Sequence, residues 1–361
     1  MLKTILPFIL LTVLPSLRAQ DYTFYALSGD RNVDQPVYLC HLNGKTGEIV
    51  VRERYGGVVG GNYYALSPDR KHLLVTSKNK AWDQGGVVQF DVEKDGRLTH
   101  VKEVLKEGDL PCHVSFTPDM KYVLSANYAD DELLLYPFTG NEIGSIKDQV
   151  VKADGSRGHY ISTGPSGEYV YAVFLGLERV YSYTIRDARL IANENQAYFS
   201  LPEGHGPRHM VFHPQKPIAY IVNEYHSSVT ACQYDPETGV LSKIQEISML
   251  PDGYSGRNSA AAIRIHPGGK FLYASNRGHN SIVVFQVSED GSLTFVEHES
   301  RDVQFPRDFN ISPDGKYMIV GNQRGHSIMS LTIDQETGAL ENTGEKLNIS
   351  APLAFEFLPE P

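Results

Sequence analysis

The chain has 361 residues and a formal net charge of −10, and it is rich in glycine, tyrosine and proline. The acidic balance argues against nucleic-acid binding, because contact with phosphates needs a basic face. The chain is longer than one small domain, but closed all-β folds of this length often form a single domain. Few runs favour helices.

The first 19 residues predict an export signal. Lys3 supplies the positive start, Ile5 to Leu17 form an apolar run too short to span a membrane with these flanks, and Leu17-Arg18-Ala19 is a plausible cleavage site. We expect a signal peptide at 1–19, a periplasmic or extracellular protein, and one domain over 20–361. No later apolar stretch approaches 18 residues, so no membrane span is expected in the mature chain.

The three cysteines, Cys40, Cys112 and Cys232, show no CxxC spacing and form no even set. They are interpreted as buried free thiols, although one disulfide among them is possible. The chain has no HExxH, no phosphate-binding loop and no GxSxG, so we expect no cofactor and no metal.

One phrase recurs along the chain: apolar residues, a Ser, Thr or His, then a proline, a small turn and four apolar residues. Examples are "HVSFTPDMKYVLSAN" and "AIRIHPGGKFLYASN". The turn prolines stand at intervals of 46 to 53 residues: Pro68, Pro118, Pro165, Pro214, Pro267 and Pro313. Each unit continues through a third apolar run, a glycine-containing turn and a fourth run. Four short strands per unit are typical of a β-propeller blade.

We therefore predict an all-β, seven-bladed β-propeller. The first unit lacks its opening strand, since "YTFYALSG" has the pattern of a second strand. The spare C-terminal strand "PLAFEFLP" is expected to complete the first blade, which closes the ring and leaves no open sheet edge.

Aligning the units on their prolines predicts which side chains share the mouth of the central channel. Arg208 starts an innermost strand and Glu224 ends the next strand of the same blade, and antiparallel neighbours place start beside end. His159 matches Arg208 one blade earlier, and Arg277 matches Glu224 one blade later. These four groups should converge, either as a functional site or as a buried ion-pair network that closes the channel. Candidate substrate-binding residues at the same mouth are Lys78, His113, Tyr128, Arg307 and Gln323.

Four phrases, "LPCHVSFTPDMKYVLSANY", "GPRHMVFHPQKPIAYIVNEYHSSVT", "IHPGGKFLYASNRGHNSIVVFQV" and "PRDFNISPDGKYMIVGNQ", resemble the lactonase family of seven-bladed propellers. The resemblance runs from about Ala26 to Pro359. That family contains bacterial 6-phosphogluconolactonases and fungal muconate-lactonizing enzymes. Its proposed site, a histidine, two arginines and a glutamate, falls on four residues of this chain: His159, Arg208, Glu224 and Arg277.

This chain departs from the family pattern in three places. "SRGH" stands where the family usually has "PHAH", Phe174 replaces an aspartate, and Ala262 stands where an acid is common. An altered pocket would mean a different lactone or loss of activity.

The resemblance implies hydrolysis of a sugar lactone, either 6-phosphogluconolactone or an unphosphorylated aldonolactone. Glu224 is the candidate general base, Arg208 and Arg277 would stabilise the oxyanion, and His159 would orient the water or protonate the leaving oxygen. Alternatively, His159 is the base and Glu224 positions the arginines, because flanking arginines weaken a carboxylate as a base. The other functions considered are muconate-type lactonization and non-catalytic binding of a carbohydrate or protein. An exported enzyme would more readily meet unphosphorylated lactones.

Overall fold

The computed structural model describes residues 20–79 and 83–358. The proposed signal peptide, 1–19, lies outside the described residues. Within the two described ranges, no helix has the length and apolar character needed to cross a membrane.

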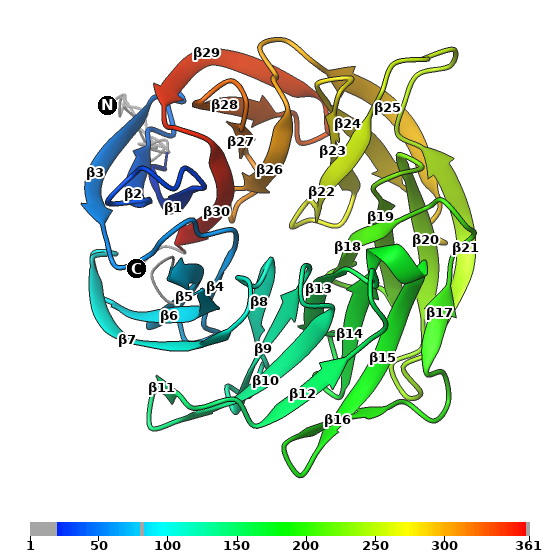
Figure 1. Cartoon of the computed structure of the whole chain (residues 1–361). Helices are drawn as coiled ribbons and strands as arrows, with labels where there is room; N and C mark the ends of the chain where they lie inside the picture. Colours follow the sequence, from blue (N-terminus) through cyan, green and yellow to red (C-terminus); the bar gives the residue numbers. More distant parts are fainter. Residues whose placement is uncertain (1–19, 80–82, 359–361) are drawn as a thin grey trace, which may run out of the picture.

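The described strands form seven antiparallel sheets arranged as blades around a central channel (Figure 1). Blade 1 comprises β30 (Pro352–Leu358), β1 (Tyr22–Ser28), β2 (Val37–Leu42) and β3 (Ile49–Tyr55). Blade 2 comprises β4 (Tyr64–Leu66), β5 (His72–Asn79), β6 (Gln84–Val92) and β7 (Leu98–Glu107). Blade 3 comprises β8 (His113–Phe116), β9 (Tyr122–Asn127), β10 (Glu132–Thr139), β11 (Glu142–Ile143) and β12 (Asp148–Val151).

Blade 4 comprises β13 (Gly158–Thr163), β14 (Tyr169–Phe174), a short 3-10 helix (Leu175–Leu177), β15 (Arg179–Arg186), β16 (Arg189–Ala192) and β17 (Tyr198–Ser200). Blade 5 comprises β18 (Pro207–Phe212), β19 (Ile218–Asn223), β20 (Ser228–Tyr234) and β21 (Leu241–Ser248). Blade 6 comprises β22 (Ser259–Ile265), β23 (Phe271–Arg277), β24 (Ser281–Val287) and β25 (Leu293–Glu299). Blade 7 comprises β26 (Pro306–Ile311), β27 (Tyr317–Asn322), β28 (Ser327–Ile333) and β29 (Leu340–Asn348). The prediction of a seven-bladed propeller is confirmed.

The C-terminal strand closes the ring, as the sequence predicted. β30 pairs antiparallel with β1 and becomes the innermost strand of blade 1. Tyr64, on β4 of the neighbouring blade, donates a hydrogen bond from its hydroxyl to the carbonyl of Ala354 at 2.8 Å and also contacts the carbonyl of Tyr25. The two ends of the chain are therefore tied to each other and to blade 2.

The core lies between neighbouring blades. Tyr220 and Val222 of β19 pack with Leu272 and Ala274 of β23 in one buried cluster, and corresponding clusters join the other blades. The second strands are buried on both faces, which explains why they are apolar throughout. All three cysteines are buried and free, as predicted.

Buried tyrosines also connect blades. A tyrosine hydroxyl in one blade donates to the carbonyl of a turn glycine in the next at 2.6–3.0 Å, in the pairs Tyr25–Gly96, Tyr171–Gly239, Tyr220–Gly291 and Tyr273–Gly338. These contacts fix the outer turns of one blade to the middle of its neighbour.

Candidate active site

Three of the candidate side chains are placed by β-bulges. In β18, Pro207 pairs with Asn223 and His209 pairs with Val222, which leaves Arg208 as the extra residue. His159 in β13 and Arg307 in β26 are the extra residues of matching bulges. A bulge breaks strand alternation and re-aims one side chain. This explains how a charged residue enters an otherwise apolar innermost strand without being buried between the blades.

Glu224 and Arg277 lie at the ends of second strands. Glu224 follows β19, and its backbone N–H donates to the carbonyl of Gly206 at 2.7 Å. Its carbonyl accepts from the N–H of Ala260 in the next blade at 3.0 Å. Arg277 is the last residue of β23. The backbone of the glutamate is therefore fixed to the innermost strands of two blades.

The carboxylate of Glu224 is held between two arginines. Nε of Arg208 lies 2.9 Å from Oε2, and Nη2 of Arg277 lies 2.9 Å from Oε1. Both guanidinium groups also donate to β22, Arg208 to the carbonyl of Ala261 at 2.7 Å and Arg277 to that of Ala260 at 2.9 Å. The register of β22 shifts between Ala260 and Ile263, so a further bulge supplies these acceptors.

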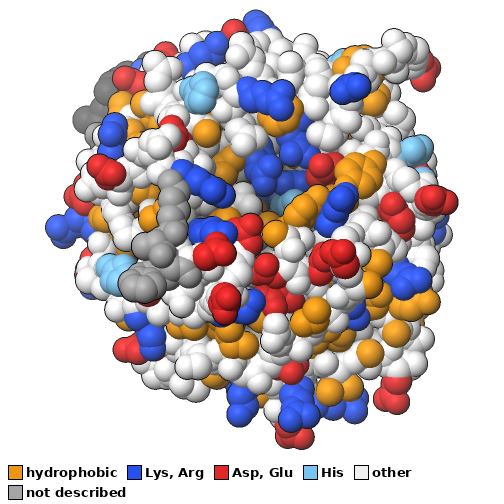
Figure 2. All heavy atoms as spheres, viewed as in Figure 1, with side chains coloured by type: hydrophobic (Ala, Val, Ile, Leu, Met, Phe, Trp, Pro, Cys, Tyr) orange, Lys and Arg blue, Asp and Glu red, His pale blue; other side chains and the backbone are white. Residues whose placement is uncertain are grey.

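A cavity of about 310 Å³ opens at this mouth. Its lining contains five of the candidate residues: Glu224, His159, Arg277, Arg307 and Tyr128. Arg208 lies beneath it and is only 2 % exposed. Figure 2 shows Lys and Arg side chains gathered around a hollow near the middle of one face. The remaining lining residues are Asn62, Asp109, Leu110, Cys112 and Ala129.

Arg307 contacts the amide oxygen of Asn62 at 3.1 Å and has no ion-pair partner among residues 20–79 and 83–358. Burial, together with Arg208 and Arg277, lowers its pKa to about 9. Burial and Arg208 lower the pKa of Arg277 to about 10. Both remain protonated at neutral pH, so three guanidinium groups lie near the carboxylate of Glu224, while Asp109, the other acid of the lining, is paired with Lys78. The mouth therefore attracts an anionic group.

His159 is buried, and its pKa lies well below the usual value because of burial and of the nearby Arg208 and Arg307. It is neutral at physiological pH. Its Nδ1 atom makes no hydrogen bond within the described structure. A neutral imidazole can orient water or substrate.

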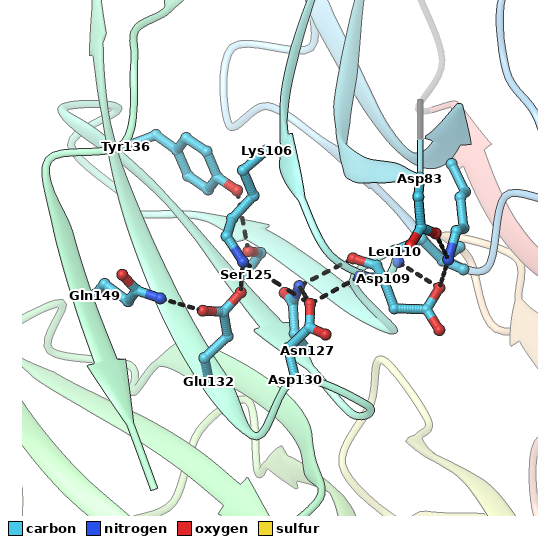
Figure 3. Close-up of polar contacts among 11 residues, drawn as sticks. Asp83, Lys106, Asp109, Leu110, Ser125, Asn127, Asp130, Glu132, Tyr136 and Gln149 are labelled. Atoms are coloured by element: carbon cyan, nitrogen blue, oxygen red, sulfur yellow. Dashed lines mark hydrogen bonds and ion pairs between the residues drawn. The ribbon is translucent and has the colours of Figure 1, made fainter. Parts of the chain in front are cut away.

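On the side of the mouth formed by blades 2 and 3, acidic side chains make ion pairs and hydrogen bonds with their neighbours (Figure 3). Lys78 bridges Asp83 and Asp109 at 3.0 Å each, and Asp109 rather than Lys78 lines the cavity. The side chain of Asn127 donates to the carbonyl of Asp109 at 3.2 Å. The backbone N–H of Asp109 donates to the carboxylate of Asp130 at 2.8 Å. Lys78 thus fixes the rim, and Asn127 has a structural role there.

His113 lies elsewhere, which corrects the expectation that it shares this mouth. It stands one residue further along its strand than Cys112, which lines the mouth cavity, and it lines a second cavity of about 360 Å³ instead. Its ring stacks on Tyr63 at 4.4 Å. Gln323 is also absent from the lining of the mouth cavity; its backbone N–H donates to the carbonyl of Phe305 at 3.3 Å.

Two of the three departures from the family pattern, Phe174 and Ala262, lie behind the cavity. Phe174 is fully buried and packs edge-on against Tyr181 at 5.3 Å. Ala262 is fully buried in the cluster between blades 6 and 7. Neither side chain lines the mouth cavity, so these substitutions alter packing behind it. Asp109 was missed in the sequence, although "DLPCH" places an acid just before an innermost strand.

Comparison with known proteins agrees with this architecture. The sequence model of the family "Lactonase, 7-bladed beta-propeller" matches residues 23–357. A 6-phosphogluconolactonase of Bacillus subtilis is 32 % identical over 82 % of this chain and 88 % of its own. One from Pectobacterium atrosepticum is 34 % identical over 77 % and 82 %.

Solved structures show the same fold. A protein from Lactobacillus plantarum superposes with a TM-score of 0.88 at 26 % identity, covering 94 % of this chain and 100 % of its own. A periplasmic gluconolactonase of Pseudomonas aeruginosa also gives 0.88, at 24 % identity over 95 % and 100 %. The family resemblance in the sequence is confirmed: the chain belongs to the lactonase family of seven-bladed β-propellers.

Proposed function

We propose that this protein hydrolyses a sugar lactone to the open acid in the mouth cavity. The observation that carries the proposal is the carboxylate of Glu224, held by Arg208 and Arg277 and facing a cavity shared with Arg307 and His159. Membership of the lactonase family and the names of the curated relatives support this reaction class.

Glu224 is the proposed general base. Nε of Arg208 and Nη2 of Arg277 each lie 2.9 Å from one carboxylate oxygen, and a carboxylate has about four acceptor positions, so a water molecule can still be held. The side chain is 18 % exposed, and it lines the cavity. A lactone is a reactive ester, for which modest activation of water is sufficient.

The arginines have a second task. As water attacks the lactone carbonyl carbon, its proton passes to Glu224 and the carbonyl oxygen becomes an oxyanion. Arg277 lines the cavity and is the group available to stabilise that charge, whereas Arg307, on the same lining, is left to bind an anionic group of the substrate. Arg208 lies deeper and holds Glu224 in place.

Ring opening completes the reaction. The tetrahedral intermediate collapses, the bond between the carbonyl carbon and the ring oxygen breaks, and the ring oxygen takes the proton from Glu224. One lactone and one water give one hydroxy acid, which then ionises. His159, being neutral, is assigned to orienting the water or the ring oxygen rather than to donating a proton.

The excess of positive charge favours a lactone that carries an anionic group, or the carboxylate of the product. The proposed export signal at 1–19 instead favours an unphosphorylated aldonolactone as substrate. Assays on both glucono-1,5-lactone and its 6-phosphate distinguish the two.

The test compares hydrolysis of both lactones with their spontaneous rates, using the wild type, Glu224→Gln and Arg277→Ala. We expect acceleration in the wild type and a loss of about 100-fold or more in each variant. The exposed pair Glu203→Gln and Arg301→Ala serves as the matched control and should retain full rate. A folded wild type that binds a sugar but accelerates neither lactone would instead favour a non-catalytic propeller.

A further inference from the structure

Blade 5 brings together three side chains that bind metals in proteins, outside the mouth cavity. Nε2 of His205 lies 2.7 Å from Oε1 of Glu246, and Nδ1 of His226 lies 3.1 Å from the same oxygen. All three ligand atoms lie within 4.8 Å of one another. This is the one such group of three or more His, Cys, Asp or Glu residues within 20–79 and 83–358.

The backbone holds this cluster in place. The N–H groups of Tyr225 and His226 donate to the carbonyl of His205 at 3.1 and 3.2 Å, which joins the loop before β18 to the turn after β19. Glu246 projects from β21, where it pairs in register with Thr230 of β20. Three separate segments of one blade therefore supply the three groups.

The donor set selects a class of ion. Two imidazole nitrogens and one carboxylate oxygen suit zinc and its neighbours in the first transition row, whereas calcium and magnesium prefer all-oxygen sites. Lys243 pairs with Oε2 of Glu246 at 2.7 Å and leaves Oε1 facing the histidines. The His226 side chain is 56 % exposed, so solvent can complete the coordination.

We propose that His205, His226 and Glu246 form a binding site for a divalent transition-metal ion, with Zn²⁺ the best match. The two imidazole rings are stacked, 4.3 Å apart at 17°. Parallel rings do not aim both lone pairs at one point, so the exposed His226 turns when the ion binds. Nδ1 of buried His205 has no hydrogen-bond partner within the described structure, which weakens binding about 10- to 100-fold relative to a fully supported site.

The site is coupled to the mouth through the backbone. Gly206, next to His205, accepts the hydrogen bond from the N–H of Glu224, which stands two residues before His226. Arg208 follows on the same loop-to-strand segment. A bound ion would clamp together the two segments that carry Arg208 and Glu224.

The test uses the full mature chain without a histidine tag, stripped of metal by a chelator and titrated with ZnCl₂ by calorimetry. We expect one zinc ion per chain, a higher Tm with zinc, and a visible absorption band when Co²⁺ replaces zinc. His226→Ala removes an exposed side chain and should fold normally. It should bind zinc at least tenfold more weakly.

His279→Ala is the matched control. His279 occupies the equivalent turn of blade 6 and contacts Ser281 at 2.8 Å as His226 contacts Ser228 at 3.1 Å, but it belongs to no three-ligand group in the described chain. It should keep the wild-type affinity. The proposal is overturned if the wild type binds no stoichiometric zinc, or if His226→Ala and Glu246→Gln bind it as tightly as the wild type.

Discussion

His159, Arg208 and Arg307 are each the extra residue of a bulge at the start of an innermost strand, and two of them, His159 and Arg307, line the mouth cavity. The next residues on β13 and β18, Tyr160 and His209, line the second cavity instead. One residue of displacement therefore separates side chains that line the mouth cavity from side chains that line the second cavity. The chemistry of the mouth depends on the backbone at these positions as much as on side-chain identity.

Arg307 provides a prediction for anion recognition. Because it has no ion-pair partner in the described structure, it is free to bind a substrate anion. We expect Arg307→Ala to raise KM for an anionic lactone about 10- to 100-fold, the cost of a charge-assisted hydrogen bond. Initial rates on glucono-1,5-lactone and its 6-phosphate measure this, with Arg301→Ala as the exposed control. An equal fall in kcat on both lactones with unchanged KM would contradict it.

At the level of elements, the hydroxyl–carbonyl contacts between blades provide a stability prediction. Tyr220 is fully buried and its hydroxyl donates to Gly291 at 3.0 Å. Tyr220→Phe keeps the ring but leaves a buried carbonyl unpaired, so we expect a loss of about 1 kcal/mol in the free energy of unfolding. Denaturant unfolding measures it. Tyr198→Phe, at an exposed position, should change little; an equal loss in both variants would refute the role of the contact.

The strands could be predicted from the sequence because the same strand pattern recurs in blade after blade. Each turn proline fixes the same point of its blade, so six copies give the order of the strands and the position of the mouth. The bulges could not be predicted, because counting residues back from each turn proline does not show which of them pair with the neighbouring strand. His113 was assigned to the mouth because of its place ahead of Pro118, but it lines the second cavity. The cluster of His205, His226 and Glu246 was also missed, because its members are 20 and 21 residues apart and match no metal motif.

At the scale of the whole molecule, the buried histidines of the channel predict acid sensitivity. Burial lowers the pKa of His113 to about 3 and, with Arg208, that of His159 and His209 well below 6.5. Below pH 6.5 the unfolded chain binds protons at these histidines that the folded chain does not, so stability falls as pH falls. We expect Tm to drop between pH 7 and pH 5. A constant or rising Tm over this range would contradict the prediction.

Glu356 acts in the opposite direction. Burial raises its pKa to about 7, so the folded state gains a proton there before the unfolded state does. Its stabilising effect is present below about pH 4.5 and is lost as pH rises through 7. Glu356→Gln should therefore raise Tm at pH 8 more than at pH 5. The same two Tm measurements serve, and an equal change at both pH values would show that Glu356 does not titrate in this way.

We propose above that the carboxylate of Glu224, held by Arg208 and Arg277, activates water for lactone hydrolysis. The most direct measurement is kcat/KM for lactone hydrolysis by purified wild type and Glu224→Gln, with equal folding shown by circular dichroism. We predict acceleration over the spontaneous rate in the wild type and a loss of at least about 100-fold in the variant. Equal rates in the two folded proteins would contradict the assignment of Glu224 to the reaction.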